Sequence, residues 1–80
     1  MKVRNNYEWR ERATEFFLEW VKVKEGWLDY DGTMFLPTMK EAARLLLDNG
    51  IFDSVEEMKE SALMDYGIIL PDDLFRKGKK

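Results

Sequence analysis

Apolar side chains recur along much of this chain at steps of three and four residues, the spacing of one face of an α-helix. The first such stretch follows Asn5 and Asn6, both good helix N-caps, and continues to about Lys24 or Glu25 before Gly26. We therefore expect one long helix here. Its predicted core face consists of Trp9, Ala13, Phe16, Phe17, Trp20 and Val21, with Val23 at its edge.

The clearest local signals lie between residues 45 and 58. Gly50 can adopt the positive φ angle that favours the end of a helix. Ser54 followed by Glu57 matches the capping box, in which the serine hydroxyl accepts the Glu57 backbone N–H and the glutamate carboxylate accepts the Ser54 backbone N–H. A helix is therefore expected to stop near Gly50, and another to start directly after Ser54.

These signals define two shorter helices. The first is predicted over about residues 39–48, after Pro37 and with Thr38 as its N-cap. The second is predicted over about residues 55–66 and stops at Gly67.

Between residues 26 and 37 the helical period is lost. Asp31-Gly32, with aromatic residues on both sides, is a strong hairpin signal, so a short β-ribbon over residues 27–36 is one interpretation. The other is an irregular loop whose aromatic side chains enter the core, namely Trp27, Tyr30 and Phe35.

The overall prediction is a mainly α fold: a single domain over residues 1–80 with three principal helices and, at most, that ribbon. The apolar run 68–70 is expected to return across the core, and Pro71 with two following aspartates favours a last helical turn. Residues 1–4 and 76–80 are expected to be frayed.

Composition narrows the chemistry. The chain contains neither cysteine nor histidine, which removes disulfides, thiolate metal sites and the commonest general base and metal ligand. Paired carboxylates remain, Glu56 with Glu57 and Asp72 with Asp73, but acids at helix starts are explained more simply by the helix dipole. We expect no enzyme, cofactor or metal. Since no signal peptide and no apolar run of about 20 residues is found, a cytoplasmic protein without a membrane partner is expected.

Charge is distributed unevenly. The net charge is −3, yet residues 28–75 carry only three basic side chains against eleven acidic ones, a net −8. A segment this acidic disfavours contact with a phosphate backbone. The four basic side chains at the end of the sequence, Arg76, Lys77, Lys79 and Lys80, offset part of that charge.

Four glutamates follow the polar side of the first predicted helix. Glu8, Glu11, Glu15 and Glu19 are spaced by three and four residues, so they form an acidic ridge. The ridge is either a solvated helix face or a contact surface for a basic partner, to which Asp29 and Asp31 would add charge near the far end of the helix. The alternative contact surface is aromatic and consists of Tyr30 and Phe35.

Residues 36–66 resemble a ribbon-helix-helix domain of the antitoxin kind. The matching residues are Leu36-Pro37, the helix end Leu46-x-x-x-Gly50, then Phe52-x-Ser54-x-x-Glu57, and Ala62-Leu63. The resemblance implies a homodimer in which strands from two chains, here including Thr33 and Phe35, enter the DNA major groove. It also implies that Ser54 and Val55 anchor a phosphate at the start of the second helix.

Two functions follow. The first is a non-enzymatic, protein-binding module of the acidic inhibitor type, comparable in size and charge to antitoxins and to phage-encoded anti-defence proteins such as anti-CRISPR proteins. Its expected partner is a protein with a basic surface. The second is a ribbon-helix-helix transcriptional regulator. We favour the first because the candidate strand at residues 33–36 holds no Arg, Lys, Asn or Gln, the residues that make most base contacts.

Overall fold

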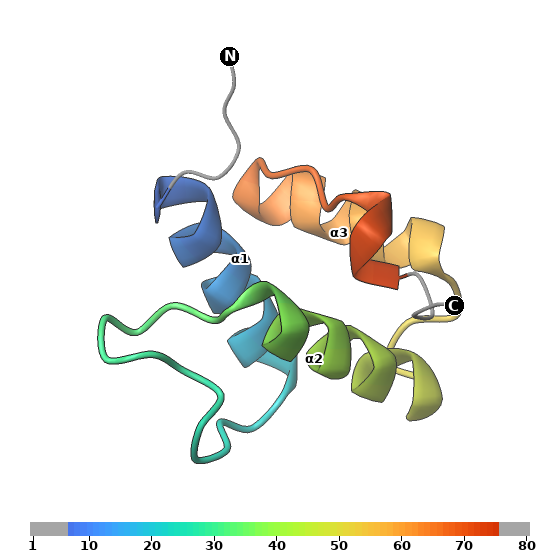
Figure 1. Ribbon diagram of the computed structural model, residues 1–80. Coiled ribbons are helices and arrows are strands. Elements are labelled where there is room, and N and C mark those ends of the chain that lie inside the picture. Colours follow the sequence, from blue (N-terminus) through green and yellow to red (C-terminus); the bar gives the residue numbers. More distant parts are fainter. Residues whose placement is uncertain (1–6, 76–80) are drawn as a thin grey trace.

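The computed structural model describes residues 7–75, and within them the fold is helical, as predicted. Helix α1 (Tyr7–Trp20) is followed by α2 (Leu36–Asp48), α3 (Val55–Tyr66) and a short 3-10 turn, η1 (Asp72–Phe75) (Figure 1). The predicted caps Asn5 and Asn6 and the predicted frayed ends, 1–4 and 76–80, lie outside the described residues.

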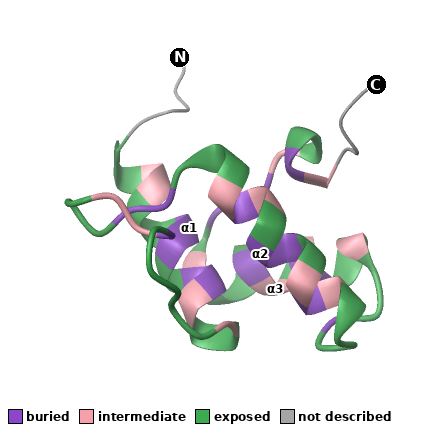
Figure 2. Cartoon of the chain, turned by 60° about the horizontal axis from the view of Figure 1, so that its bottom comes forward, coloured by how far each residue is buried: buried purple, intermediate pink, exposed green. Residues whose placement is uncertain are grey.

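The core lies where the three helices meet (Figure 2). Phe16 is at its centre, edge-on to Phe17 and Tyr66 and stacked on Phe52 at 6.1 Å. Because the aromatic rings come from two helices and a connection, burying them holds these elements together. The other buried apolar residues of the three helices are Ala13 of α1, Met39, Ala42, Ala43 and Leu46 of α2, and Met58 and Ala62 of α3.

Helix α1 ends at Trp20, so the prediction that it reaches Lys24 or Glu25 is wrong. The chain turns at Gly26, which has φ +90°, and the Trp27 N–H donates to the Lys24 carbonyl at 3.0 Å. Trp27 is thereby buried in the core. A longer straight helix would carry this ring along the helix axis, away from the core, by 1.5 Å per residue. Burial of the indole therefore overrides the local helical pattern.

Helix α2 begins earlier than predicted, because Phe35 and not Thr38 is the N-cap residue. The Met39 N–H donates to the Phe35 carbonyl at 2.9 Å, which places Pro37 inside the first turn. Proline fits there, since its fixed φ is helical and the first turn needs no N–H donor from it. Thr38 is therefore a residue of the helix itself.

The connection from α2 to α3 follows its local sequence signals. Gly50 has φ +75°, and the Ile51 and Gly50 N–H groups donate to the Leu46 and Leu47 carbonyls, the pattern of a Schellman motif. The Glu57 N–H donates to the Ser54 hydroxyl at 3.1 Å.

The second half of the predicted capping box differs. The Glu57 carboxylate accepts the backbone N–H of Asp53, at 2.9 Å, and not that of Ser54. The carboxylate reaches one residue further back, to the N–H of the residue that precedes the N-cap Ser54.

The predicted β-ribbon over 27–36 is not formed: residues 7–75 contain no strand, and the pairing there is a single antiparallel bridge between Leu28 and Met34. The physical reason is that side chains accept the backbone N–H groups of this segment. The Met34 N–H donates to the Thr14 hydroxyl of α1, and the Thr33 N–H donates to the Asp29 carboxylate. Side chains take the hydrogen bonds that a longer ladder would need.

The segment after α3 returns along that helix and places η1 beside α2 (Figure 1). Gly67 ends α3 with φ +69°. Ile68 and Leu70 are then buried while Ile69 between them is exposed, and Leu74 of η1 is also buried. The prediction that residues 68–70 cross the core is therefore confirmed for two of the three side chains.

Candidate functional site

The turn at residues 28–34 is organised by one carboxylate. Asp29 accepts the backbone N–H groups of Asp31 and Thr33 at 2.9 and 3.0 Å, and its oxygens also lie 3.0 and 3.1 Å from the Thr33 hydroxyl. These hydrogen bonds, first that from the Thr33 backbone, hold the pKa of the Asp29 carboxyl below its usual value. The turn therefore has a fixed shape, completed by Gly32 at φ +85°.

Helix α1 fixes the position of this turn. The buried Thr14 hydroxyl accepts the Met34 N–H at 2.7 Å and donates to the Arg10 carbonyl at 2.8 Å. The Arg10 guanidinium lies 3.4 Å from both the Asp29 carboxylate and the Thr33 hydroxyl. Asp29 therefore lies beside the first half of α1, and not near its far end as expected from the sequence.

The three aromatic side chains of this connection have different environments. Trp27 is 5% exposed, in agreement with the loop interpretation, but Tyr30 is 98% exposed and Phe35 is 48% exposed. The loop interpretation is therefore wrong where it placed Tyr30 and Phe35 in the core. Arg10 lies over the Phe35 ring, 5.5 Å from its centre, which fixes one face of the ring and leaves the rest accessible.

Tyr7 shows that the acidic ridge and the turn approach each other. The pKa of its phenol is raised by partial desolvation, and then by the negative charges of Asp31, Glu11 and Asp29. Carboxylates of α1 and of the turn thus act on the same phenol. We call this surface the acidic-aromatic face and define it by Tyr7, Glu11, Tyr30, Asp31 and Phe35.

The remaining glutamates of the ridge are exposed, but two of them interact within the chain. Glu8 pairs with Arg12 one turn later at 3.6 Å. Glu19 accepts the Tyr66 hydroxyl at 2.8 Å and so joins α1 to the end of α3; this bond is the main reason that the pKa of Tyr66 is raised to about 12. Glu15 is exposed on the same side of α1.

The ribbon-helix-helix interpretation is wrong, because residues 7–75 provide no strand from which a two-chain ribbon could form. Thr33 is buried inside the turn and Phe35 is the N-cap residue of α2, so neither lies on a strand. Ser54 caps α3, and Val55 is the first residue of that helix. The intertwined dimer and the DNA contacts implied by the resemblance lose their structural basis.

Two other carboxylates have contacts at the start of α3 and beside η1. Glu57 serves the start of α3, and Asp72 pairs with Lys59. Within residues 7–75 no cluster of three acidic side chains is arranged to hold a metal ion. No helix in this part of the chain is long and apolar enough to cross a membrane.

Three residues of the region were missed from the sequence: Tyr7, Arg10 and Thr14. Of these, Thr14 could have been recognised in the sequence, because it is a polar residue inside the apolar stripe of the first helix. A buried hydroxyl there needs a partner, and the partner is a backbone N–H that comes 20 residues later. No protein-family model, curated protein or solved structure matches this chain.

Proposed function

We propose that this chain is a non-enzymatic protein-binding module of the acidic inhibitor type, and that its acidic-aromatic face contacts a basic surface of a partner protein. The observation that carries the proposal is the environment of Tyr30. Its side chain is 98% exposed at the tip of a turn whose backbone is held by Asp29 and joined to α1 through Thr14.

A fixed turn of this kind lowers the cost of binding. Tyrosine contributes a large contact area with few rotatable bonds, and it is common among the residues that dominate binding energy. When the backbone is already held in place, less conformational entropy is lost on association. Phe35 adds a second accessible ring, and Arg10, which lies over it, also contacts Asp29 of the turn.

The charges around these rings favour a basic partner. Within residues 7–75, Glu11, Glu15 and Asp31 form no ion pair, whereas Glu8 and Asp29 do. Their negative charge is therefore available to attract positive side chains during encounter and to suppress contacts with acidic surfaces.

This proposal places the protein with small acidic inhibitors, such as antitoxins and anti-defence proteins encoded by phages. It also places the contact in the cytoplasm, where a small domain without cysteine needs no disulfide for its function. Size, charge and the exposed turn held by Asp29 support this class.

The test starts with capture of the partner from the source cell by the full chain, followed by affinity measurements. Tyr30→Ala is expected to weaken binding at least about ten-fold, mainly through faster dissociation. The double variant Glu11→Lys with Asp31→Lys is expected to slow association, most strongly at low ionic strength.

Matched controls distinguish the face from general surface effects. Met64→Ala removes another exposed apolar side chain, and Glu60→Lys reverses another exposed charge, both on α3. Both controls should bind normally. If Met64→Ala weakens binding and Tyr30→Ala does not, the partner contacts α3 and the proposed face is wrong.

A further inference from the structure

The end of α2 carries a chemically reactive pair of residues, Asn49-Gly50. When glycine follows asparagine, no side chain hinders the glycine nitrogen, which can attack Cγ of the asparagine and close a five-membered ring. The sequence contains three asparagines, Asn5, Asn6 and Asn49, and no glutamine, and only Asn49 precedes a glycine. Asn49 and Gly50 are both exposed, so water reaches them. Loss of a side-chain amide is therefore chemically easiest at this pair.

The reaction requires only water. The Gly50 nitrogen gives up its proton and forms a bond to Cγ of Asn49, the bond between Cγ and Nδ2 breaks, and the amide nitrogen leaves with that proton as ammonia. The product is a succinimide. Water then opens the ring at one of its two carbonyls, which gives aspartate or isoaspartate. In isoaspartate the main chain runs through Cγ and is longer by one methylene group.

The folded end of α2 holds this pair in an unreactive geometry. The Gly50 N–H donates to the Leu47 carbonyl at 3.2 Å, and the Asn49 side-chain amide donates to the Leu45 carbonyl at 2.8 Å. The ψ angle of Asn49 is 4°, which turns the Gly50 nitrogen away from Cγ. Closing the ring requires a large rotation about the Cα–C bond of Asn49, and that rotation breaks the hydrogen bond to Leu47. The helix end must therefore open before the attack.

We propose that Asn49 is a deamidation site whose modification is gated by opening of the α2–α3 connection. Exposed helix ends open locally far more often than a whole protein unfolds. The rate of deamidation then depends on how often this connection opens. The inference concerns another part of the molecule than the acidic-aromatic face and does not rest on the proposed function.

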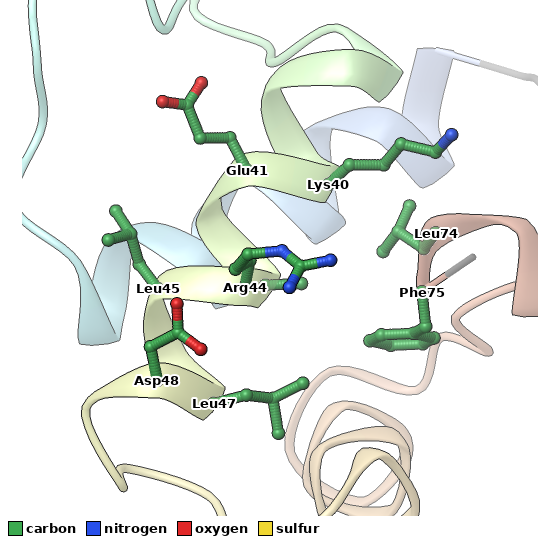
Figure 3. Close-up of a pocket in the computed structure, with 9 residues that line it drawn as sticks. Lys40, Glu41, Arg44, Leu45, Leu47, Asp48, Leu74 and Phe75 are labelled. Carbon is green, nitrogen blue, oxygen red and sulfur yellow. The ribbon is translucent and has the colours of Figure 1, made fainter. Parts of the chain in front are cut away.

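The modification weakens the helix end that protects the site. Both products place a carboxylate at the negative end of the helix dipole, next in sequence to Asp48, one of the residues around the pocket between α2 and η1 (Figure 3). A carboxylate has no N–H group, so the hydrogen bond to the Leu45 carbonyl is lost. Isoaspartate also lengthens the main chain before Gly50 and displaces its turn. Since Phe52 of the same connection is buried beside Phe16, the loosening reaches the core.

The test follows the full chain in mildly alkaline buffer, once folded and once unfolded in urea. Fragmentation mass spectrometry measures aspartate and isoaspartate at each asparagine. In urea, Asn49 is expected to react faster than Asn5 and Asn6 and to give both products. Without urea its reaction should be slower by at least about ten-fold, because the pair reacts only while the connection is open.

Three outcomes of that comparison would overturn the proposal. Equal rates at Asn49 with and without urea would show that the fold does not gate the reaction. A reaction in urea no faster than that of Asn5 and Asn6, or one that yields aspartate alone, would exclude the succinimide. No product in the folded chain after prolonged incubation would show that the connection does not open far enough.

A matched pair of serine variants tests the gating. Ser54→Ala removes the hydroxyl that accepts the Glu57 N–H at the start of α3 and leaves the reactive pair unchanged. It should speed deamidation of the folded chain up to about five-fold and leave the rate in urea unaltered. Ser61→Ala, the same substitution further along α3, should leave both rates as in the parent. Equal rates for both folded variants would contradict gating by this connection.

The consequence of the modification is tested by Asn49→Asp, which introduces one of the two products directly. Asn49→Ser is the control, since it also removes the side-chain amide but adds no charge. The aspartate variant should melt at a lower temperature than the serine variant, and added salt should narrow the difference. Equal melting temperatures would show that the new charge does not weaken the helix end.

Discussion

The two connections between the main helices are built in different ways. The α2–α3 connection, residues 49–54, is held by contacts between neighbours in sequence: Ile51 with Leu46, and Ser54 with Glu57. The α1–α2 connection, residues 21–35, is held by contacts with α1, such as Thr14 with Met34, 20 residues apart. The short connection can form before the helices pack, whereas the long one requires α1 to be in place.

The two connections also differ in how their side chains divide between the core and the solvent. The short connection ends one helix, starts another and adds Phe52 to the core beside Phe16. The long connection buries Trp27 and yet leaves Tyr30 exposed, so the same segment contributes to the core and presents a side chain to solvent. Three substitutions and one pH titration test the comparison.

The largest effect is expected from Trp27→Ala. Removing a buried indole should destabilise the protein by about 3–5 kcal/mol, because the cavity is refilled only in part. Tyr30→Ala in the same connection should change the free energy of unfolding by no more than about 0.5 kcal/mol. Urea unfolding measures both. Similar costs for the two variants would show that the connection does not divide into a buried and an exposed part.

A smaller loss is expected from Thr14→Val, which keeps the shape of the side chain and removes its hydroxyl. The buried Met34 N–H then has no acceptor, at a cost of about 1–3 kcal/mol. Thr14→Ser restores the hydroxyl and should recover most of that loss. A valine variant as stable as the parent would mean that the connection is held without this long-range bond.

The short connection is tested by Gly50→Ala. A Cβ at this position meets no atom within 4 Å, so the expected cost, about 1 kcal/mol, comes from the positive φ angle alone. Chemical synthesis with D-alanine at residue 50 is the control, since a D-residue favours positive φ. The D-alanine protein should melt at or above the temperature of the parent, and equal destabilisation by both forms would contradict a conformational origin.

The smallest effect is local and depends on pH. The pKa of Asp29 is lowered in the folded protein, so its carboxylate stabilises the turn above the unfolded value of 3.8 and this contribution is lost as the pH falls through the lower folded value. The N–H signals of Asp31 and Thr33 should shift in that acid range. The Ile51 N–H, bonded to the uncharged Leu46 carbonyl, provides the internal reference. Unchanged turn signals in acid would show that Asp29 does not hold the turn.

The helix boundaries that could be predicted from the sequence are those set by residues close to them in the chain. The stop of α2 before Gly50 follows from the positive φ angle that this glycine can adopt. The start of α3 after Ser54 follows from the serine hydroxyl, which accepts the N–H of Glu57 three residues later. The end of α1 was not predictable in this way, because it depends on where Trp27 finds a core. Of the two interpretations of residues 27–36, the ribbon was wrong, because Asp31-Gly32 gives the same turn signal whether or not its flanks pair in a ladder.

For the candidate surfaces, the sequence alone determined which charges and rings were available: the glutamates of α1, the aspartates beside Gly32, and the aromatic residues of the long connection. Only the tertiary structure decided their roles. It joined Asp29 to Arg10 and left Tyr30 in solvent. The physical reason is that helical spacing specifies one face of one helix, whereas the neighbours of that face are set by how the cores of all the helices pack together.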